Sequence, residues 1–149
     1  SWFIKVTEKR DRMYELNKEI NWKPKSTGEG RFGNWLKNAN DWNLSRSRYW
    51  GIPLPIWRTE DGAEEIIIGS TEELKKEMQK SVEKGFMQKD IFADFEVGNM
   101  SDENYDKIDL HKNIVDHIVL VSPYVNPMNR EADLRDVWFD YGWMPYPQC

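Results

Sequence analysis

Arg46 and Arg48 stand two positions apart in the segment NLSRSRYWGIPLPIW, followed by an aromatic pair, a glycine and two prolines. A guanidinium group presents a planar set of donors that matches two phosphate oxygens at once, so this spacing suits an anionic partner. The alternative is that both arginines form ion pairs with nearby carboxylates such as Asp41, as surface arginines commonly do. Both interpretations stay open on these residues alone.

The other residues that could do chemistry form weaker patterns. Asp136 and Asp140 are four positions apart, but no feature of the sequence places a reacting group between them, as acid–base catalysis requires. His111 and His117 are six positions apart without a thiolate partner, so we expect no zinc site. The single cysteine, Cys149, excludes an internal disulfide and a cysteine cluster for metal. We therefore predict no metal ligands and no catalytic residues in this chain.

The composition limits the class of protein. The length of 149 residues fits one domain, and 32% charged with 39% apolar residues is typical of a soluble globular chain. A net charge of −5 argues against a domain that binds nucleic acid mainly through its own positive charge. The sequence has no run of 18 apolar residues, so we expect no membrane span. We also expect both ends to be cut from a longer chain, and most of the eight tryptophans to anchor a small core.

The amino-terminal part predicts a strand, a helix and a loop. Residues 1–6 favour a short strand, and Thr7 can cap a helix over 8–20. Three apolar residues at helical spacing give this helix one apolar stripe: Met13, Leu16 and Ile20. A proline and three glycines in 21–33 indicate a loop. The apolar residues that follow predict a short helix ending near 38–41.

The next part predicts a hairpin. Pro53 and Pro55 favour an extended segment, because proline fixes its own φ and disfavours a helical residue before it. Residues 52–57 are therefore an edge strand or the approach to a strand. The pair Asp61 and Gly62 is a turn signal between two extended runs, and it predicts a hairpin.

A capped helix and two further strands are predicted beyond the hairpin. Ser70 and Glu73 form a capping box, and Gly85 can end the helix that follows. Its buried stripe consists of Leu74, Met78 and Val82. The acidic residues 92–106 predict an irregular surface loop. Two later segments predict strands, the second of which runs into a turn or a helix: 115–123 and 133–145.

Three blocks of the sequence resemble one enzyme family. The segment GNWLKNANDWNLSRSRYWGIPLPIW resembles class I aminoacyl-tRNA synthetases of the branched-aliphatic subgroup where the catalytic domain resumes after the editing insertion. The family pattern W-x-x-S-R-x-R-x-W-G-x-P-x-P is met by Trp42, Ser45, Arg46, Arg48, Trp50, Gly51, Pro53 and Pro55. DVWFDYGWMP resembles D-V-W-F-D-S-G, and IDLHKNIVDHIVLV resembles D-L-H-R-P-x-V-D. Within the subgroup, NANDWNLSR, IPLPIW and DVWFD favour the isoleucyl enzymes.

The resemblance implies an α/β fold with an α+β insertion. Residues 1–59 would return to a Rossmann-type catalytic domain, 60–130 would form an inserted connective subdomain, and 131–149 would lead back to the catalytic domain. The parent enzyme would activate isoleucine with ATP and Mg²⁺ and transfer it to tRNA(Ile), as a cytoplasmic monomer. The signatures H-I-G-H and K-M-S-K-S are absent from this sequence, so the chain alone would be inactive. The alternative is a stand-alone acidic protein-interaction module without catalysis.

The resemblance also implies particular site residues. Arg46, Arg48 and Trp50 would lie in the region that handles the tRNA end or the adenylate, and Trp138 would lie against the side chain of bound isoleucine. The last block departs from the family, because Tyr141 and Trp143 replace small residues and Pro147 and Cys149 alter the tail. Relatives often place paired cysteines near residues 122–131, which this chain lacks, so we expect no zinc.

Overall fold

The computed structural model describes residues 1–146, and they form two compact units with mixed helices and strands. The first unit is Ser1–Ser45 and the second is Arg46–Cys149. The expected mixed α/β class is confirmed. The expected domain boundaries at 59/60 and 130/131 both fall inside the second unit, and they stay a prediction.

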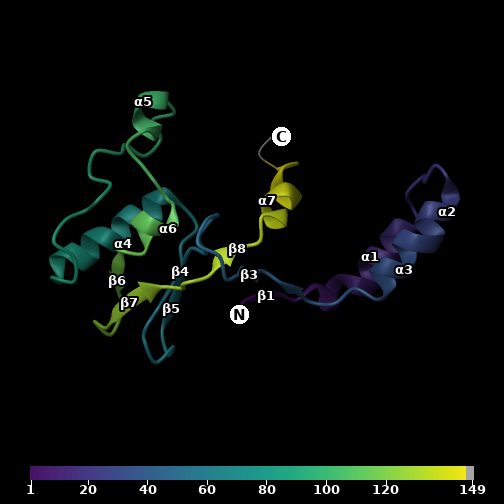
Figure 1. Ribbon diagram of the computed structural model, residues 1–149, viewed down its shortest axis with the longest axis horizontal. Coiled ribbons are helices and arrows are strands. Elements are labelled where there is room, and N and C mark those ends of the chain that lie inside the picture. Colours follow the sequence, from purple (N-terminus) through teal and green to yellow (C-terminus); the bar gives the residue numbers. More distant parts are fainter. Residues whose placement is uncertain (147–149) are drawn as a thin grey trace. The chain divides into compact units, whose positions relative to one another are not determined.

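The first unit contains a two-stranded sheet and a group of helical segments (Figure 1). Strand β1 pairs antiparallel with β2, and helices α1 and α3 lie side by side. Its elements are β1 (Phe3–Ile4), the 3₁₀ helix η1 (Val6–Lys9), α1 (Arg10–Asn17), α2 (Lys25–Thr27), the π-helical segment η2 (Gly28–Phe32), α3 (Gly33–Lys37) and β2 (Trp42–Asn43).

Residues 21–33, predicted as a loop, are mostly helical, because their glycines allow close packing and do not break the helix. A Cβ atom at Gly28 would lie 2.0 Å from Cδ1 of Trp22, and one at Gly33 would lie 2.5 Å from the carbonyl oxygen of Gly28. The buried side chain of Asn17 donates to that same oxygen at 2.9 Å and accepts from Nε1 of Trp22 at 2.9 Å. A polar side chain thus lies at the centre of these helices.

The prediction for the first helix was partly wrong. Thr7 does not cap it, because the Thr7 hydroxyl donates to Oδ1 of Asp41 at 2.8 Å. Helix α1 begins later, at Arg10, and ends at Asn17, before the last residue of the predicted apolar stripe. Leu16 and Ile20 are both exposed, so the stripe is not buried.

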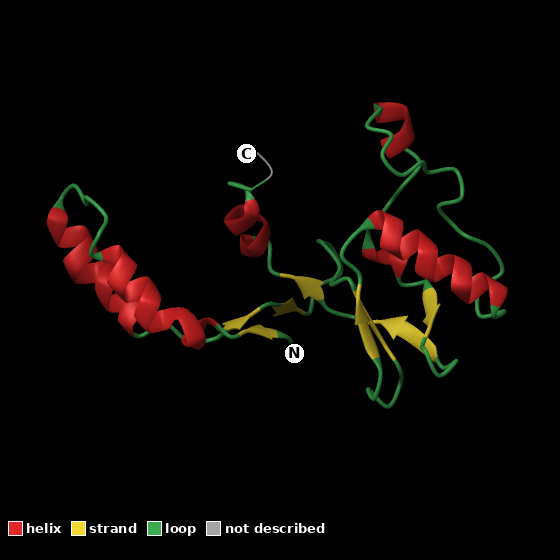
Figure 2. Ribbon diagram, turned by 180° about the vertical axis from the view of Figure 1, so that it is seen from behind, coloured by secondary structure: helices red, strands yellow, loops and turns green. Residues whose placement is uncertain are grey.

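The second unit is organised around a four-stranded antiparallel sheet of order β5-β4-β7-β6. Helix α4 packs against this sheet and contacts β6 (Figure 2). The strands of this unit are β3 (Ser45–Arg46, at its start), β4 (Ile56–Arg58), β5 (Glu65–Ile67), β6 (Val119–Val121), β7 (Pro127–Arg130) and β8 (Leu134–Arg135). The helices are α4 (Thr71–Glu83), α5 (Asp102–Tyr105), α6 (Lys112–Val115) and α7 (Trp138–Trp143). Among residues 1–146, no helix is both long and apolar enough to cross a membrane.

The hairpin between β4 and β5 is confirmed. Gly62 adopts φ +69°, a conformation that glycine accepts readily, and the amide of Thr59 donates to the carbonyl of Glu64 at 3.0 Å. The alternative of an edge strand at 52–57 is wrong, since β4 lies between β5 and β7. Pro53 and Pro55 precede β4, so the missing donors fall outside its ladder.

Helix α4 begins and ends as predicted. The amide of Glu73 donates to Oγ of Ser70 at 3.1 Å, while the Glu73 carboxylate accepts from the amide of Gly69 at 2.7 Å. Gly85, at φ +81°, follows the end of the helix. Leu74 and Met78 are buried. The capping box is therefore present, with its carboxylate displaced by one residue to Gly69.

The core of the second unit joins the sheet, α4 and the segment predicted as a surface loop. Its buried members are Trp57, Ile68, Leu74, Met78, Phe92, Phe95, Val115, Ile118, Leu120 and Met128. The ammonium group of Lys75 holds the predicted loop by donating to the carbonyls of Phe92 at 2.8 Å and Phe95 at 2.6 Å. That segment is thus fastened to the core, which the acidic composition did not indicate.

Tryptophan contributes less to the core than expected. Trp57 is buried, and its Nε1 donates to the carbonyl of Ile118 at 2.9 Å. The other tryptophans are partly or largely exposed, and four have most of their surface open: Trp35, Trp50, Trp138 and Trp143. The large aromatic rings are therefore mainly a surface feature of this chain.

Candidate functional site

Arg46 connects the first sequence block with the last. Its guanidinium group forms an ion pair with the buried carboxylate of Asp136, so the ion-pair alternative is confirmed for Arg46, with Asp136 as the partner. The other oxygen of Asp136 accepts from the amide of Trp138 at 3.2 Å. Asp136 therefore positions the start of α7 and Arg46 at the same time. The positive charge of Arg46 is thus paired with a carboxylate of the chain itself. That Arg46 contacts tRNA or the adenylate stays a prediction.

Arg48 and Trp50 are both exposed. Arg48 makes no ion pair with any carboxylate of residues 1–146. The Trp50 indole lies on the imidazole of His111, with ring centroids 4.5 Å apart and an interplanar angle of 18°. The sequence did not single out His111 for this contact, because His111 lies 61 positions after Trp50.

His111 is held by Asp109. The backbone amide of His111 donates to Oδ1 of Asp109 at 2.9 Å, and Nδ1 of its ring lies 2.7 Å from the same oxygen. These two hydrogen bonds hold the pKa of the Asp109 carboxyl below its usual value, the backbone bond having the larger effect. A carboxylate can only accept, so the ring donates from Nδ1 and leaves Nε2 away from this contact.

Trp138 begins α7 and is 68% exposed. Its ring lies 5.3 Å from that of Tyr141, between centroids, and Tyr141 and Trp143 are themselves exposed. Arg135 steadies this segment by an ion pair with Asp140 and by a position 4.9 Å over the Phe139 ring. The predicted contact of Trp138 with isoleucine stays a prediction, and the altered residues Pro147 and Cys149 lie outside the described residues.

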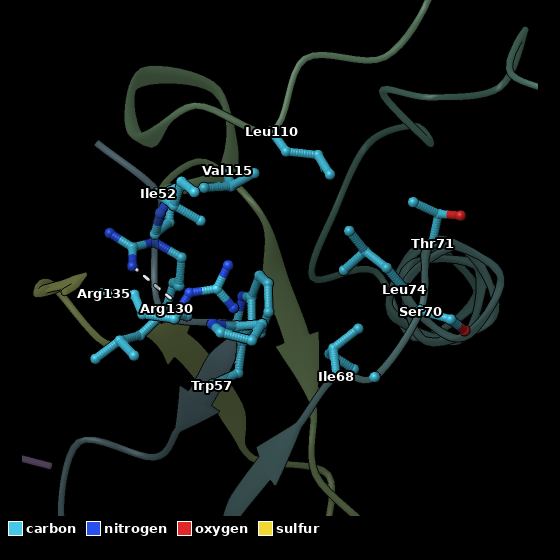
Figure 3. A pocket seen from close by; sticks show the side chains of 14 residues that line it. Ile52, Trp57, Ile68, Ser70, Thr71, Leu74, Leu110, Val115, Arg130 and Arg135 are labelled. Atoms are coloured by element: carbon cyan, nitrogen blue, oxygen red, sulfur yellow. Dashed lines mark hydrogen bonds between the residues drawn. The ribbon is translucent and has the colours of Figure 1, made fainter. Parts of the chain in front are cut away.

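An apolar cavity of about 280 Å³ lies beside α4 (Figure 3). Residues from four segments line it, among them Ile52, Ile68, Leu110 and Arg130. The predicted site residues Arg46, Arg48, Trp50 and Trp138 do not belong to its lining. The structure therefore does not bring the predicted site residues together around this cavity.

A buried arginine beside this cavity was not predicted. The Arg130 side chain is 1% exposed, and its guanidinium donates to Asp116 and to the carbonyls of Leu54 at 3.3 Å and Asp133 at 3.1 Å. Burial raises the pKa of the Asp116 carboxyl. The hydrogen bonds and positive charges of Lys112 and Arg130 lower it by more than burial raises it, so the pKa lies below its usual value. Arg130 ends β7 between the polar residues Asn129 and Glu131, so no local signal in the sequence indicates that its side chain is buried.

The described part of the chain contains no group of three or more His, Cys, Asp or Glu side chains placed to hold a metal ion. His111 and His117 are therefore not joined by further ligands of these types. The site consists of the exposed Arg48, two positions before Trp50 in the sequence, the stacked rings of Trp50 and His111, and the ion pair between Arg46 and Asp136, which connects two distant blocks.

The whole chain, residues 1–149, matches the family model described as tRNA synthetases class I (I, L, M and V). The chain belongs to this family. Among its curated relatives, the isoleucine–tRNA ligase of Bacteroides thetaiotaomicron is 63% identical over 150 residues, which cover 99% of this chain and 13% of that protein. The isoleucine–tRNA ligases of Porphyromonas gingivalis and Mycobacterium tuberculosis are 60% and 38% identical over 148 and 154 residues.

The match to the class I family confirms the resemblance of the sequence blocks. The aligned region includes 99% of this chain in both cases, but only 13% and 12% of the length of these two relatives. A class I synthetase of that length contains most of its residues outside the segment described above.

Proposed function

We propose that the chain is an internal segment of an isoleucine–tRNA ligase that activates isoleucine with ATP and transfers it to tRNA(Ile). The observation that carries this proposal is the identity of 63% to an isoleucine–tRNA ligase along 99% of the chain. The Arg46–Asp136 ion pair supports it, because it joins the two blocks that the family resemblance identifies.

The parent protein would supply the groups that this chain lacks. ATP-dependent activation needs positioned charges on the phosphates, with Mg²⁺ as the usual partner of ATP. The segment would contribute residues 1–59 and 131–149 to the catalytic domain and 60–130 to a connective subdomain. The parent would act as a monomer in the cytoplasm.

Within this proposal, Trp138 forms one wall of the isoleucine pocket. Its ring is exposed in the described structure, as expected of a side chain whose partner is a ligand or another part of the parent. Such a flat wall rejects larger side chains by overlap but separates isoleucine from valine poorly, since one methylene is worth about 1–3 kcal/mol. Trp138→Ala in the parent should raise the KM for isoleucine and leave that for ATP nearly unchanged. Loss of thermal stability with unchanged isoleucine KM would identify Trp138 as a structural residue.

The two arginines should behave differently in the parent. Arg46→Ala leaves the buried carboxylate of Asp136 without its cation, so it should lower amino-acid activation and tRNA charging together. Arg48→Ala removes an exposed charge and should weaken the RNA-dependent step more than activation. Equal effects of the two substitutions on both steps would contradict this division.

ATP–pyrophosphate exchange tests the proposal. The full-length parent should exchange in the presence of isoleucine and more weakly with valine, while the 149-residue chain, checked for folding by circular dichroism, should not exchange. A parent that exchanges only with another amino acid would overturn the assignment. A natural reading frame that encodes little more than this chain would favour the interaction module instead.

A further inference from the structure

The Trp50 ring has one face on His111 and remains 68% exposed. We propose that the Trp50–His111 stack is a platform for an unpaired nucleobase of a single-stranded RNA end, with Arg48 binding an adjacent phosphate. This inference rests on the proposed function and names the partner of the exposed site. It assigns Trp50 to RNA and not to the adenylate.

The stack of Trp50 on His111 is preformed in the absence of a ligand. His111 directly precedes α6, and Asp109 holds both its backbone amide and its ring. On the other side of the stack, Gly51 adopts φ +146°, which favours glycine and places a bend directly after Trp50. Trp50 and His111, 61 positions apart in the sequence, are thus fixed so that their rings lie nearly parallel. A ring that is already ordered loses little conformational freedom when a base stacks on it.

The geometry suits a planar heterocycle. Unpaired bases are recognised by stacking on aromatic side chains, and stacking tolerates any base because each has a π face. A cavity of about 450 Å³ adjoins the platform, and its lining includes Gly51, Asp109 and His111 together with the polar side chain of Asn99. This space would receive the base or its neighbour and offer hydrogen-bonding groups to the base edge.

The charge pattern favours one nucleotide of a strand over a nucleoside triphosphate. Arg48 lies two positions before Trp50 and has no ion-pair partner within the described range, in a chain of net charge −5. A triphosphate concentrates several negative charges and is bound by several cations. One arginine two positions before the ring of one aromatic platform matches one phosphate and one base.

The test uses the full-length parent and a short single-stranded oligoribonucleotide whose 3′-terminal base is 2-aminopurine, a base whose fluorescence falls on stacking. Trp50→Ala should weaken binding about tenfold, and by more than it lowers isoleucine-dependent exchange. Trp50→Phe should keep most of the affinity, because a ring remains. The matched control is Trp35→Ala, an equally exposed tryptophan of the first unit, which should leave the affinity unchanged.

Two further variants separate the parts of the platform. His111→Phe keeps a ring under Trp50 and should bind better than His111→Ala, which removes the support. Arg48→Gln should reduce the slope of log affinity against log salt by about 0.7, the contribution of one phosphate of a single strand.

The outcomes separate this inference from the proposed function. If the parent shows isoleucine-dependent exchange but Trp50→Ala binds the oligonucleotide like the unaltered parent, the inference fails and the proposed function stands. It also fails if Trp50→Ala lowers exchange as much as RNA affinity, or if Trp35→Ala weakens binding equally. A parent without isoleucine-dependent exchange overturns the proposed function, whatever the oligonucleotide does.

Discussion

The two units of the chain are stabilised by different means. Among the described residues, all the buried apolar side chains belong to the second unit except Leu36 and Ala39. The first unit instead depends on the buried amide of Asn17 and on the contact of Gly28 with the Trp22 ring. A hydrophobic core tolerates small displacements, whereas a few directional hydrogen bonds require defined geometry.

The two units should therefore lose stability through different kinds of substitution. In the second unit, substitutions that remove core volume should lower the free energy of unfolding most, because burial of apolar surface is the main stabilising contribution there. In the first unit, loss of a single hydrogen-bonding group should have a disproportionate local effect, since little apolar surface compensates for it. Substitutions matched for residue type between the units test this difference.

The largest effect is expected for Trp57→Ala. The substitution empties a buried site in the second unit and removes a hydrogen bond to Ile118, so it should lower the free energy of unfolding by about 3–5 kcal/mol. Trp35→Ala, at an exposed tryptophan of the first unit, should change it by less than about 1 kcal/mol. Chemical denaturation of both variants measures the difference, and similar losses would remove the proposed contrast between the units.

A somewhat smaller effect is expected for Asp116→Asn. It leaves the buried cation of Arg130 without its carboxylate, which should cost about 2–3 kcal/mol at neutral pH. The loss stays below that of a fully buried pair because the Asp116 side chain is 35% exposed and water partly screens its charge.

The loss at Asp116 should depend on pH in one direction. The pKa of Asp116 is lower in the folded state, so its stabilisation is complete above the ordinary aspartate value of 3.8 and is lost as the pH falls through the folded value. The unaltered chain and Asp116→Asn should therefore converge in acid. Denaturation curves between neutral and acid pH measure this, and a constant difference would show that the charge of Asp116 is not the cause.

The first unit is tested by Asn17→Ala. The substitution leaves the carbonyl of Gly28 and Nε1 of Trp22 without their partner, at a cost of about 1–2 kcal/mol. Hydrogen exchange should increase in residues 10–37 and stay unchanged in the sheet of the second unit. Asn38→Ala, which removes an exposed hydrogen bond to Asn34, is the control and should have little effect. Increased exchange throughout the chain would show that the units are not independently stabilised.

The smallest effect is expected for Ser70→Ala. It removes the cap of α4 and should cost about 1 kcal/mol, whereas Ser70→Gly should cost only a few tenths. Ser101→Ala, at the cap of the shorter α5, should cost less, because that hydrogen bond is longer, at 3.4 Å. Thermal unfolding followed by circular dichroism measures the series. A larger loss at Ser101 than at Ser70 would contradict the ranking.

Local signals in the sequence predicted the second unit better than the first. The turn at Asp61 and Gly62 and the cap at Ser70 were found because each depends on a few neighbouring residues. The helical character of 21–33 was missed because Gly28 and Gly33 serve close packing, which a loop signal does not distinguish. Periodicity alone also placed Leu16 on an apolar stripe, although its side chain is exposed.

The candidate site shows the same limit. The sequence motif identified Arg46, Arg48 and Trp50 as a group, but the partners of Arg46 and Trp50 come from elsewhere in the chain. Asp136 lies 90 positions from Arg46, and His111 lies 61 positions from Trp50. Pairings over such distances are set by the fold, and a single sequence contains no local signal for them.

Strand β5 is the outer strand on one side of the four-stranded sheet, and this position has a consequence for self-association. Its free edge could template a strand from a second molecule, and the exposed Ile67 would favour that contact. Glu64 and Glu65 stand at the start of the same edge. In a parallel, in-register stack of such edges, Glu65 would lie next to its own copy, and the repulsion between these like charges would oppose fibril growth.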